Sequence, residues 1–275
     1  TDGAGVKLVR VLGNLTTKEF DPILMLDSFD SINPDDYTAG FPMHPHRGIE
    51  TISYVSRGKM VHRDSLGNEA GISDGEVQWM NSGSGIMHEE MVPAAERLLG
   101  VQLWLNLPAK DKMSKPSYNS IKNEDIKEIE IEGGKIRLLA GKYGEHEGYK
   151  GDYLSMDYYD IHLNADAEVT LTMEEDDSVM VFTLLGDVYI DGEHIEEKTA
   201  VKLTEGDSLT IKNGNEKAQV LYMNSRALNE PVAWAGPIVM NTQEELQKAF
   251  LELRSNTFIK AVSYTHLTLP TTSRV

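Results

Sequence analysis

The chain has 275 residues, of which 40% are hydrophobic and 25% are charged. This length is sufficient for two domains that each bury a core, and the composition is typical of a soluble globular protein. No apolar run approaches the ~20 residues that span a bilayer, so we expect no membrane segment. The absence of cysteine excludes disulfides, thiolate nucleophiles and cysteine-ligated metal sites.

The charge balance is strongly acidic, with a formal net charge of -18 at pH 7 and a pI near 4.8. Such a surface repels a phosphate backbone, so we predict no direct nucleic-acid partner, whereas metal cations are attracted to it. No export signal is visible in the sequence, which favours a cytoplasmic location, although the chain begins at Thr1 rather than at a methionine.

Short strand-like segments follow one another along most of the chain. Residues 51–55 alternate and end at Gly58, and residues 101–107 alternate and stop at Pro108. Many short strands with little helix between them predict an all-β fold built from sandwiches or barrels. The polar stretch 108–129 is expected to connect two β-rich halves. Further strands are expected at residues 168–173, 178–185, 187–190 and 209–212.

One helix is predicted near the end of the sequence. Thr242 and Glu245 have the spacing of a capping box, and apolar residues follow at helical intervals, which is typical of a packing helix. The apolar positions are Leu246, Ala249, Phe250 and Leu253.

The last fifteen residues are expected to be foreign to the natural chain. Residues 262–270 read like the translation of a sequencing adapter, so we exclude the segment 261–275 from the fold. His266 is therefore not a ligand candidate.

Two histidine-containing pairs carry the chemical signal. His44 and His46 flank Pro45 in an extended segment, where side chains two residues apart share a face. His88 and Glu90 have the same spacing and follow a glycine-bearing turn at residues 81–85. If the two segments form facing strands of one barrel, three imidazoles and one carboxylate would bind a single divalent metal and leave positions open for other ligands.

The remaining candidates are weaker. His62 is expected at the rim of the site or behind a ligand, and Glu50, four residues after His46, would share its face on a continuous strand but lie about 13 Å along it. We therefore favour Glu90 as the carboxylate ligand and assign Glu50 a supporting or structural role. Three isolated histidines are expected to be exposed or satisfied by the fold: His146, His162 and His194.

Six motifs occur in a characteristic order, at residues 21–27, 44–51, 62–65, 77–80, 85–91 and 102–108. Together they make the chain resemble the pirin family of bicupins. The resemblance implies two cupin (jelly-roll) barrels packed face to face, with a metal-binding N-terminal domain (residues 1–128) and a metal-free C-terminal domain with the helix (residues 129–260). His44, His46, His88 and Glu90 fall on the family's ligand positions.

The resemblance also implies a function. It points to Fe(II), while the ligand set also suits Mn, Co, Ni, Cu or Zn, with raw affinity favouring the late metals. Some bacterial pirins are associated with cleavage of flavonols such as quercetin by dioxygen, and in that chemistry Glu90 would also act as the catalytic base. The alternative is a non-enzymatic, iron-dependent regulator that binds transcription or metabolic proteins. A third possibility is a metal-binding fold without turnover. All three need the same ligands, so the sequence leaves the choice open.

Overall fold

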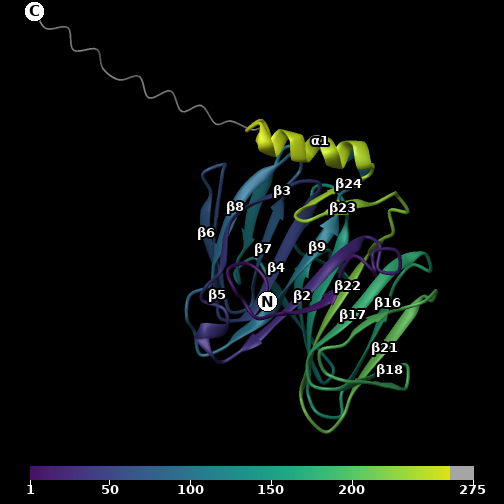
Figure 1. Ribbon diagram of the computed structural model, residues 1–275. Coiled ribbons are helices and arrows are strands. Elements are labelled where there is room, and N and C mark those ends of the chain that lie inside the picture. Colours follow the sequence, from purple (N-terminus) through teal and green to yellow (C-terminus); the bar gives the residue numbers. More distant parts are fainter. Residues whose placement is uncertain (261–275) are drawn as a thin grey trace, which may run out of the picture.

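Two β-barrels and one helix near the end make up the fold of residues 1–260 (Figure 1). The computed structural model describes residues 1–260, so the predicted foreign segment 261–275 and His266 lie outside the described residues. Within the described part, no helix is long and apolar enough to cross a membrane. The predicted all-β class is confirmed, and each predicted strand overlaps an observed one, with ends that extend beyond it by at most one residue.

The first barrel is built from two antiparallel sheets. Two short 3-10 turns, η1 (Pro34–Asp36) and η2 (Ala109–Asp111), join its strands. Its four-stranded sheet has the order β3 (Phe41–His46), β8 (Ile86–Met91), β5 (Lys59–Asp64) and β6 (Glu69–Ser73). Its six-stranded sheet has the order β1 (Val9–Leu12), β2 (Ile23–Ser31), β9 (Leu98–Asn106), β4 (Ile49–Arg57), β7 (Glu76–Asn81) and β10 (Ser117–Ile121).

The second barrel repeats this architecture with a different interior. Its six-stranded sheet has the order β11 (Lys127–Ile131), β12 (Gly134–Ala140), β15 (Met156–Leu163), β22 (Ala218–Arg226), β17 (Asp177–Leu185) and β20 (Ala200–Lys202). Its four-stranded sheet has the order β16 (Glu168–Thr172), β21 (Ser208–Asn213), β18 (Val188–Ile190) and β19 (Glu193–Ile195), and β13 (Lys142–Tyr143) pairs with β14 (His146–Glu147). Buried apolar side chains such as Ile161, Val181 and Ile211 fill this barrel.

The two six-stranded sheets pack against each other across a shared core. Ile52 and Leu103 of the first barrel belong to the same buried cluster as Tyr158 and Phe182 of the second. Successive side chains of a strand point to opposite faces, so β4 and β9 present one set of residues to this core and the other set to the interior of the first barrel. This explains why β9 is buried along its whole length.

The chain returns to the first barrel after β22. Strands β23 (Ala233–Ala235) and β24 (Ile238–Met240) pair with each other, and α1 (Gln243–Arg254) begins at the predicted capping box of Thr242 and Glu245. Arg47 anchors this segment: its backbone oxygen accepts from the Val239 amide, and its buried guanidinium pairs with Glu252 at 2.8 Å. In Figure 1 the helix accordingly lies near β3 and β24.

The stretch 108–129 differs from the predicted connector. It contains β10, which pairs with β7, and the beginning of β11, which pairs with β12. Lys112 in this stretch is buried, and its ammonium donates to the Gly48 and Val239 carbonyls and to the Asn106 side chain. Polar composition suggested a solvated segment, but here the polar groups satisfy backbone carbonyls inside the fold.

Candidate metal centre

Strand register in the four-stranded sheet places the predicted ligands next to one another. β8 lies between β3 and β5, so His88 is opposite His44 on one side and opposite Asp64 on the other. Residues directly opposite in an antiparallel pair share a face. A bulge in β3 separates Phe41, opposite Glu90, from His44, and bulges of this kind re-aim nearby side chains.

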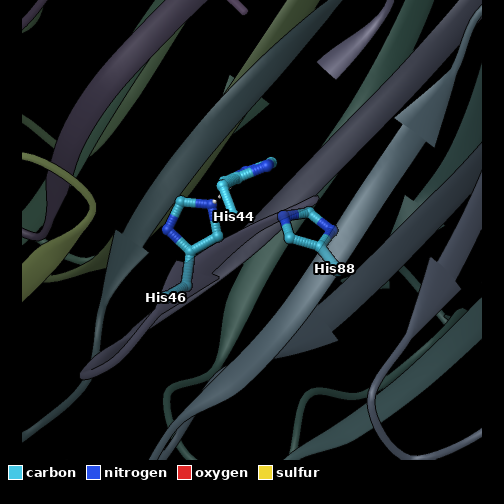
Figure 2. A group of neighbouring side chains, drawn as sticks. All are labelled: His44, His46 and His88. Atoms are coloured by element: carbon cyan, nitrogen blue, oxygen red, sulfur yellow. Dashed lines mark hydrogen bonds between the residues drawn. The ribbon is translucent and has the colours of Figure 1, made fainter. Parts of the chain in front are cut away.

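The three histidines converge inside the first barrel. His44 and His46 extend from β3 and His88 from the neighbouring β8, and Figure 2 shows the three rings gathered over these two strands. One nitrogen from each ring lies within 4.8 Å of the corresponding nitrogens of the other two. The prediction that these three side chains meet at one point of the fold agrees with this geometry.

Hydrogen bonds fix how two of the rings are oriented. The Nδ1 of His44 donates to the Pro42 carbonyl at 2.8 Å, and the Nδ1 of His46 donates to the Pro237 carbonyl at 3.0 Å. Because a carbonyl oxygen only accepts, both rings must carry a proton on Nδ1, and a neutral ring then has a lone pair on Nε2. The two Nε2 atoms face each other at 3.0 Å.

Burial keeps the inner rings neutral. Loss of water, with the nearby His44 adding to the effect, lowers the pKa of His46 to about 3. Burial also places the pKa of His88 well below its usual range, with the neighbouring imidazoles adding to the effect. Neutral imidazole is the form that binds metals, so these rings do not have to lose a proton first.

The arrangement fits a divalent cation. Two nitrogens bound at right angles to one ion at ~2.1 Å would lie about 3 Å apart, as the His44 and His46 Nε2 atoms do. Two lone pairs facing each other at this distance repel unless a positive charge lies between them. Among residues 1–260, the buried Nε2 of His88 has no hydrogen-bond partner, which is costly unless a ligand binds there.

Glu90 lies on the same inner face but outside the three-histidine cluster. Its carboxylate is buried and accepts hydrogen bonds from the side-chain amides of Gln78 and Gln102, the latter at 3.0 and 3.1 Å to its two oxygens. The Gln102 amide also donates to Ser53 at 2.9 Å. Glu90 as a fourth ligand therefore stays a prediction, and its present partners are two amide donors of the six-stranded sheet.

A cleft of about 540 Å³ leads to the histidines. His44, His46 and Glu90 line it, together with the aromatic rings of Trp104 and Trp234. This volume is within the range of small-molecule sites. A larger hollow of about 990 Å³ lies elsewhere and is lined by none of the four predicted ligands.

Comparison with known proteins identifies the family. The family model described as Pirin matches residues 5–105, and that of the Pirin C-terminal cupin domain matches residues 158–259. A Pseudomonas aeruginosa protein named "Putative quercetin 2,3-dioxygenase" is 39% identical over 264 residues, covering 92% of each chain. Human pirin is 35% identical over 265 residues, covering 93% of this chain and 89% of its own. The chain belongs to the pirin family.

A solved structure supports the same assignment. The crystal structure of a quercetin 2,3-dioxygenase from Acinetobacter baumannii matches this pirin with a TM-score of 0.85 and 31% identity, over 94% of this chain and 93% of the other. The implied pair of cupin barrels is thereby confirmed.

The other acidic and histidine candidates have separate roles in this pirin. The expectation that Glu50 shares the face of His46 is wrong, because the chain turns at Arg47-Gly48 and Glu50 begins a new strand, β4. On the same strand, Ser53 points into the first barrel, whereas the next residue, Tyr54, reaches Asp160 of the second barrel. Because side chains alternate along a strand, Glu50 lies on the same side as Tyr54 and faces the core between the barrels. The isolated histidines behave as expected: His146 and His194 are exposed, and His162 donates to Asp160.

Some residues around the centre could not be found from the sequence. Pro237, whose carbonyl orients His46, lies 191 positions after it in the sequence. Trp234, in the same segment that returns to the first barrel, packs against Trp104 with 5.5 Å between the ring centroids. Arg10, at the cleft, pairs with Asp27 at 2.8 Å. A carbonyl acceptor has no sequence signature, so the Pro237 contact depends entirely on tertiary structure. His62, expected near the rim or behind a ligand, is fully buried directly behind His88.

Proposed function

We propose that this pirin binds one divalent metal, Fe(II) in the cell, and uses it to cleave flavonols such as quercetin with dioxygen. His44, His46 and His88 would provide three nitrogens, and Glu90 would provide a carboxylate oxygen after turning from its amide partners. The observation that carries the proposal is the convergence of three imidazoles, two of which also line a cleft of small-molecule size.

The choice of metal follows from the ligand chemistry and from the relatives. Three imidazoles and a carboxylate accept Fe, Mn, Co, Ni, Cu or Zn, and late metals bind more tightly, so supply in the cell decides which ion is present. The names of a 39% identical relative and of a 31% identical solved structure refer to quercetin 2,3-dioxygenase, which favours a metal with oxygen chemistry.

A bound divalent cation would lower the pKa of a coordinated hydroxyl group and orient it toward a second ligand. The chain's own residues would provide positioning and proton transfer. Trp104, which contacts the His46 ring edge-to-face with centroids 5.0 Å apart, and Trp234 offer flat apolar walls to an aromatic ring system. Glu90 lines the same cleft and is a carboxylate within the site that could receive the hydroxyl proton.

Oxygen uptake by the iron-loaded protein tests this proposal. Protein loaded anaerobically with Fe(II) should consume dioxygen when quercetin is added, and it should not do so without quercetin. Glu90→Gln should retain most of its iron, because three histidines remain, but should lose most of the quercetin-dependent uptake. One iron per chain without any quercetin-dependent uptake would contradict the enzymatic proposal and favour the regulator alternative, in which a protein partner replaces the substrate.

A further inference from the structure

A chain of hydrogen-bonded groups lies behind His88 on the side away from His44 and His46. The Nδ1 of His88 is 3.3 Å from the Nδ1 of His62, and the Nε2 of His62 is 2.8 Å from a carboxylate oxygen of Asp64. The His62 and Asp64 side chains are both 0% exposed, so water cannot replace either partner. The two rings and the carboxylate must therefore satisfy one another.

The positions of the protons follow from the donor and acceptor properties of these groups. An ionised Asp64 only accepts, so His62 has to carry a proton on Nε2. A neutral His62 then has a lone pair on Nδ1 and can only accept there. The Nδ1 of His88 must therefore be the donor in the contact between the rings, and its Nε2 is left with the lone pair. That Nε2 is one of the buried atoms that have no hydrogen-bond partner within the part of the chain that the structure describes.

Asp64 and His62, at the end of this hydrogen-bonded series away from the metal site, are held rigidly. One oxygen of Asp64 accepts from the backbone amides of Leu66 and Asn68, at 2.8 and 3.1 Å, and the other accepts from the Asn68 side chain at 2.8 Å. The ring of Tyr118 stacks on His62 with a centroid separation of 4.0 Å and an interplanar angle of 13°. Both the carboxylate and the His62 ring plane are thus fixed by the fold.

We propose that Asp64 and His62 are positioning residues that hold His88 in the tautomer with its proton on Nδ1, so that Nε2 is ready to bind the metal. This inference rests on the metal site of the proposed function. Partners of this kind behind a metal-binding histidine raise its basicity and fix its orientation, and their loss typically weakens metal binding about 10- to 100-fold. Here the carboxylate acts through a second imidazole rather than directly.

The substitution Asp64→Asn should reverse the direction of hydrogen-bond donation between residue 64, His62 and His88. The oxygen that accepts from two backbone amides has to remain an oxygen, so the new amide nitrogen takes the position that faces His62. That nitrogen donates, which moves the His62 proton to Nδ1 and removes the acceptor for His88. The favoured tautomer of His88 would then carry its proton on Nε2, where it blocks the metal.

The matched control is Asp187→Asn. Asp187 accepts from the exposed His194 at 3.0 Å in the second barrel, so the same chemical change affects an Asp–His pair without a nearby ligand cluster. A second test variant, His62→Leu, removes the hydrogen bonds to both neighbours and serves if Asp64→Asn does not fold. The measurements on the control and on both test variants do not require catalytic turnover.

Nitrogen-15 NMR of the histidine side chains in metal-free protein reads the tautomers directly, and titration with Co(II) measures affinity. We expect a proton on Nδ1 of His88 in the unchanged protein, a shift toward Nε2 in Asp64→Asn, and a 10- to 100-fold weaker affinity in Asp64→Asn and His62→Leu but not in Asp187→Asn. A proton on Nε2 of His88 or a doubly protonated His62 in the unchanged protein would overturn the inference, as would unchanged affinity in both test variants. If the unchanged protein binds no Co(II) or Fe(II), the proposed function fails, while the NMR result still decides the tautomer.

Discussion

Glu50 gives a prediction that separates the core between the barrels from the metal centre. Its side chain is 1% exposed, and one carboxylate oxygen has no hydrogen-bond partner among the residues that the structure describes. Burial, with a further contribution from the nearby Asp152, raises the pKa of Glu50 to about 7 from a usual value of 4.5. The folded protein therefore holds the proton of Glu50 more tightly than the unfolded chain does.

The sign and size of the effect follow from this difference. Below pH 4.5 Glu50 is protonated in both states and costs nothing, and between 4.5 and 7 the folded state binds more protons, so stability falls as the pH rises. Above pH 7 the full penalty is about 3 kcal/mol, of which about 2.5 kcal/mol develops between pH 5 and pH 8. Glu50→Gln removes the charge and should abolish this part of the pH dependence.

Denaturant unfolding at pH 5 and pH 8 measures the prediction. The free energy of unfolding of Glu50→Gln, relative to the unchanged protein, should rise by about 2.5 kcal/mol from pH 5 to pH 8. Glu96→Gln, at an exposed position of the first barrel, is the control for loss of a surface carboxylate. An equal effect of Glu50→Gln at both pH values would refute the reasoning, because a carboxyl that ionises freely in the folded state carries no such penalty.

Three further predictions concern other parts of the chain. Gln102→Leu removes the amide that donates to both oxygens of Glu90. Fe(II) affinity and quercetin-dependent oxygen uptake should both change, while His88 keeps its tautomer. If both values were unchanged, the Gln102 amide would have no influence on Glu90. Arg47→Met breaks the ion pair with Glu252 and leaves the Ser84 and Phe258 carbonyls without the guanidinium donor. The free energy of unfolding measured in urea should therefore fall by about 3 kcal/mol or more. A fall of less than about 1 kcal/mol would contradict the anchoring role of Arg47. Removing residues 261–275 should leave the melting temperature and metal content unchanged if, as we expect, these residues are foreign to the natural chain, and a fall of several degrees would contradict that expectation.

Periodicity and spacing were sufficient for the parts of the fold that depend on local pattern. The alternation of residues 101–107 predicted a strand with two different faces, and β9 indeed presents Leu103 to the core between the barrels and Gln102 to the barrel interior. The capping box at Thr242, the His-x-His pair in β3 and the His-x-Glu pair in β8 could be recognised in the sequence for the same reason. Each depends on residues within one turn or one strand.

Contacts between distant segments could not be predicted in this way. Glu50 was placed on the face of His46 because four residues on one strand share a face, but Gly48, with a φ of +80°, allows the chain to turn between β3 and β4. The Pro237 carbonyl that orients His46 belongs to a segment that crosses back from the second barrel. Neither the turn nor the return leaves a periodic signal, and both follow from tertiary packing.

The metal content of histidine variants tests the central claim most directly. Protein purified metal-free, loaded anaerobically with Fe(II) and desalted should retain one iron per chain by elemental analysis, whereas His44→Ala and His88→Ala should retain almost none while keeping the β-rich circular dichroism spectrum of the unchanged protein. Iron content equal to that of the unchanged protein in both variants would contradict the assignment of this site.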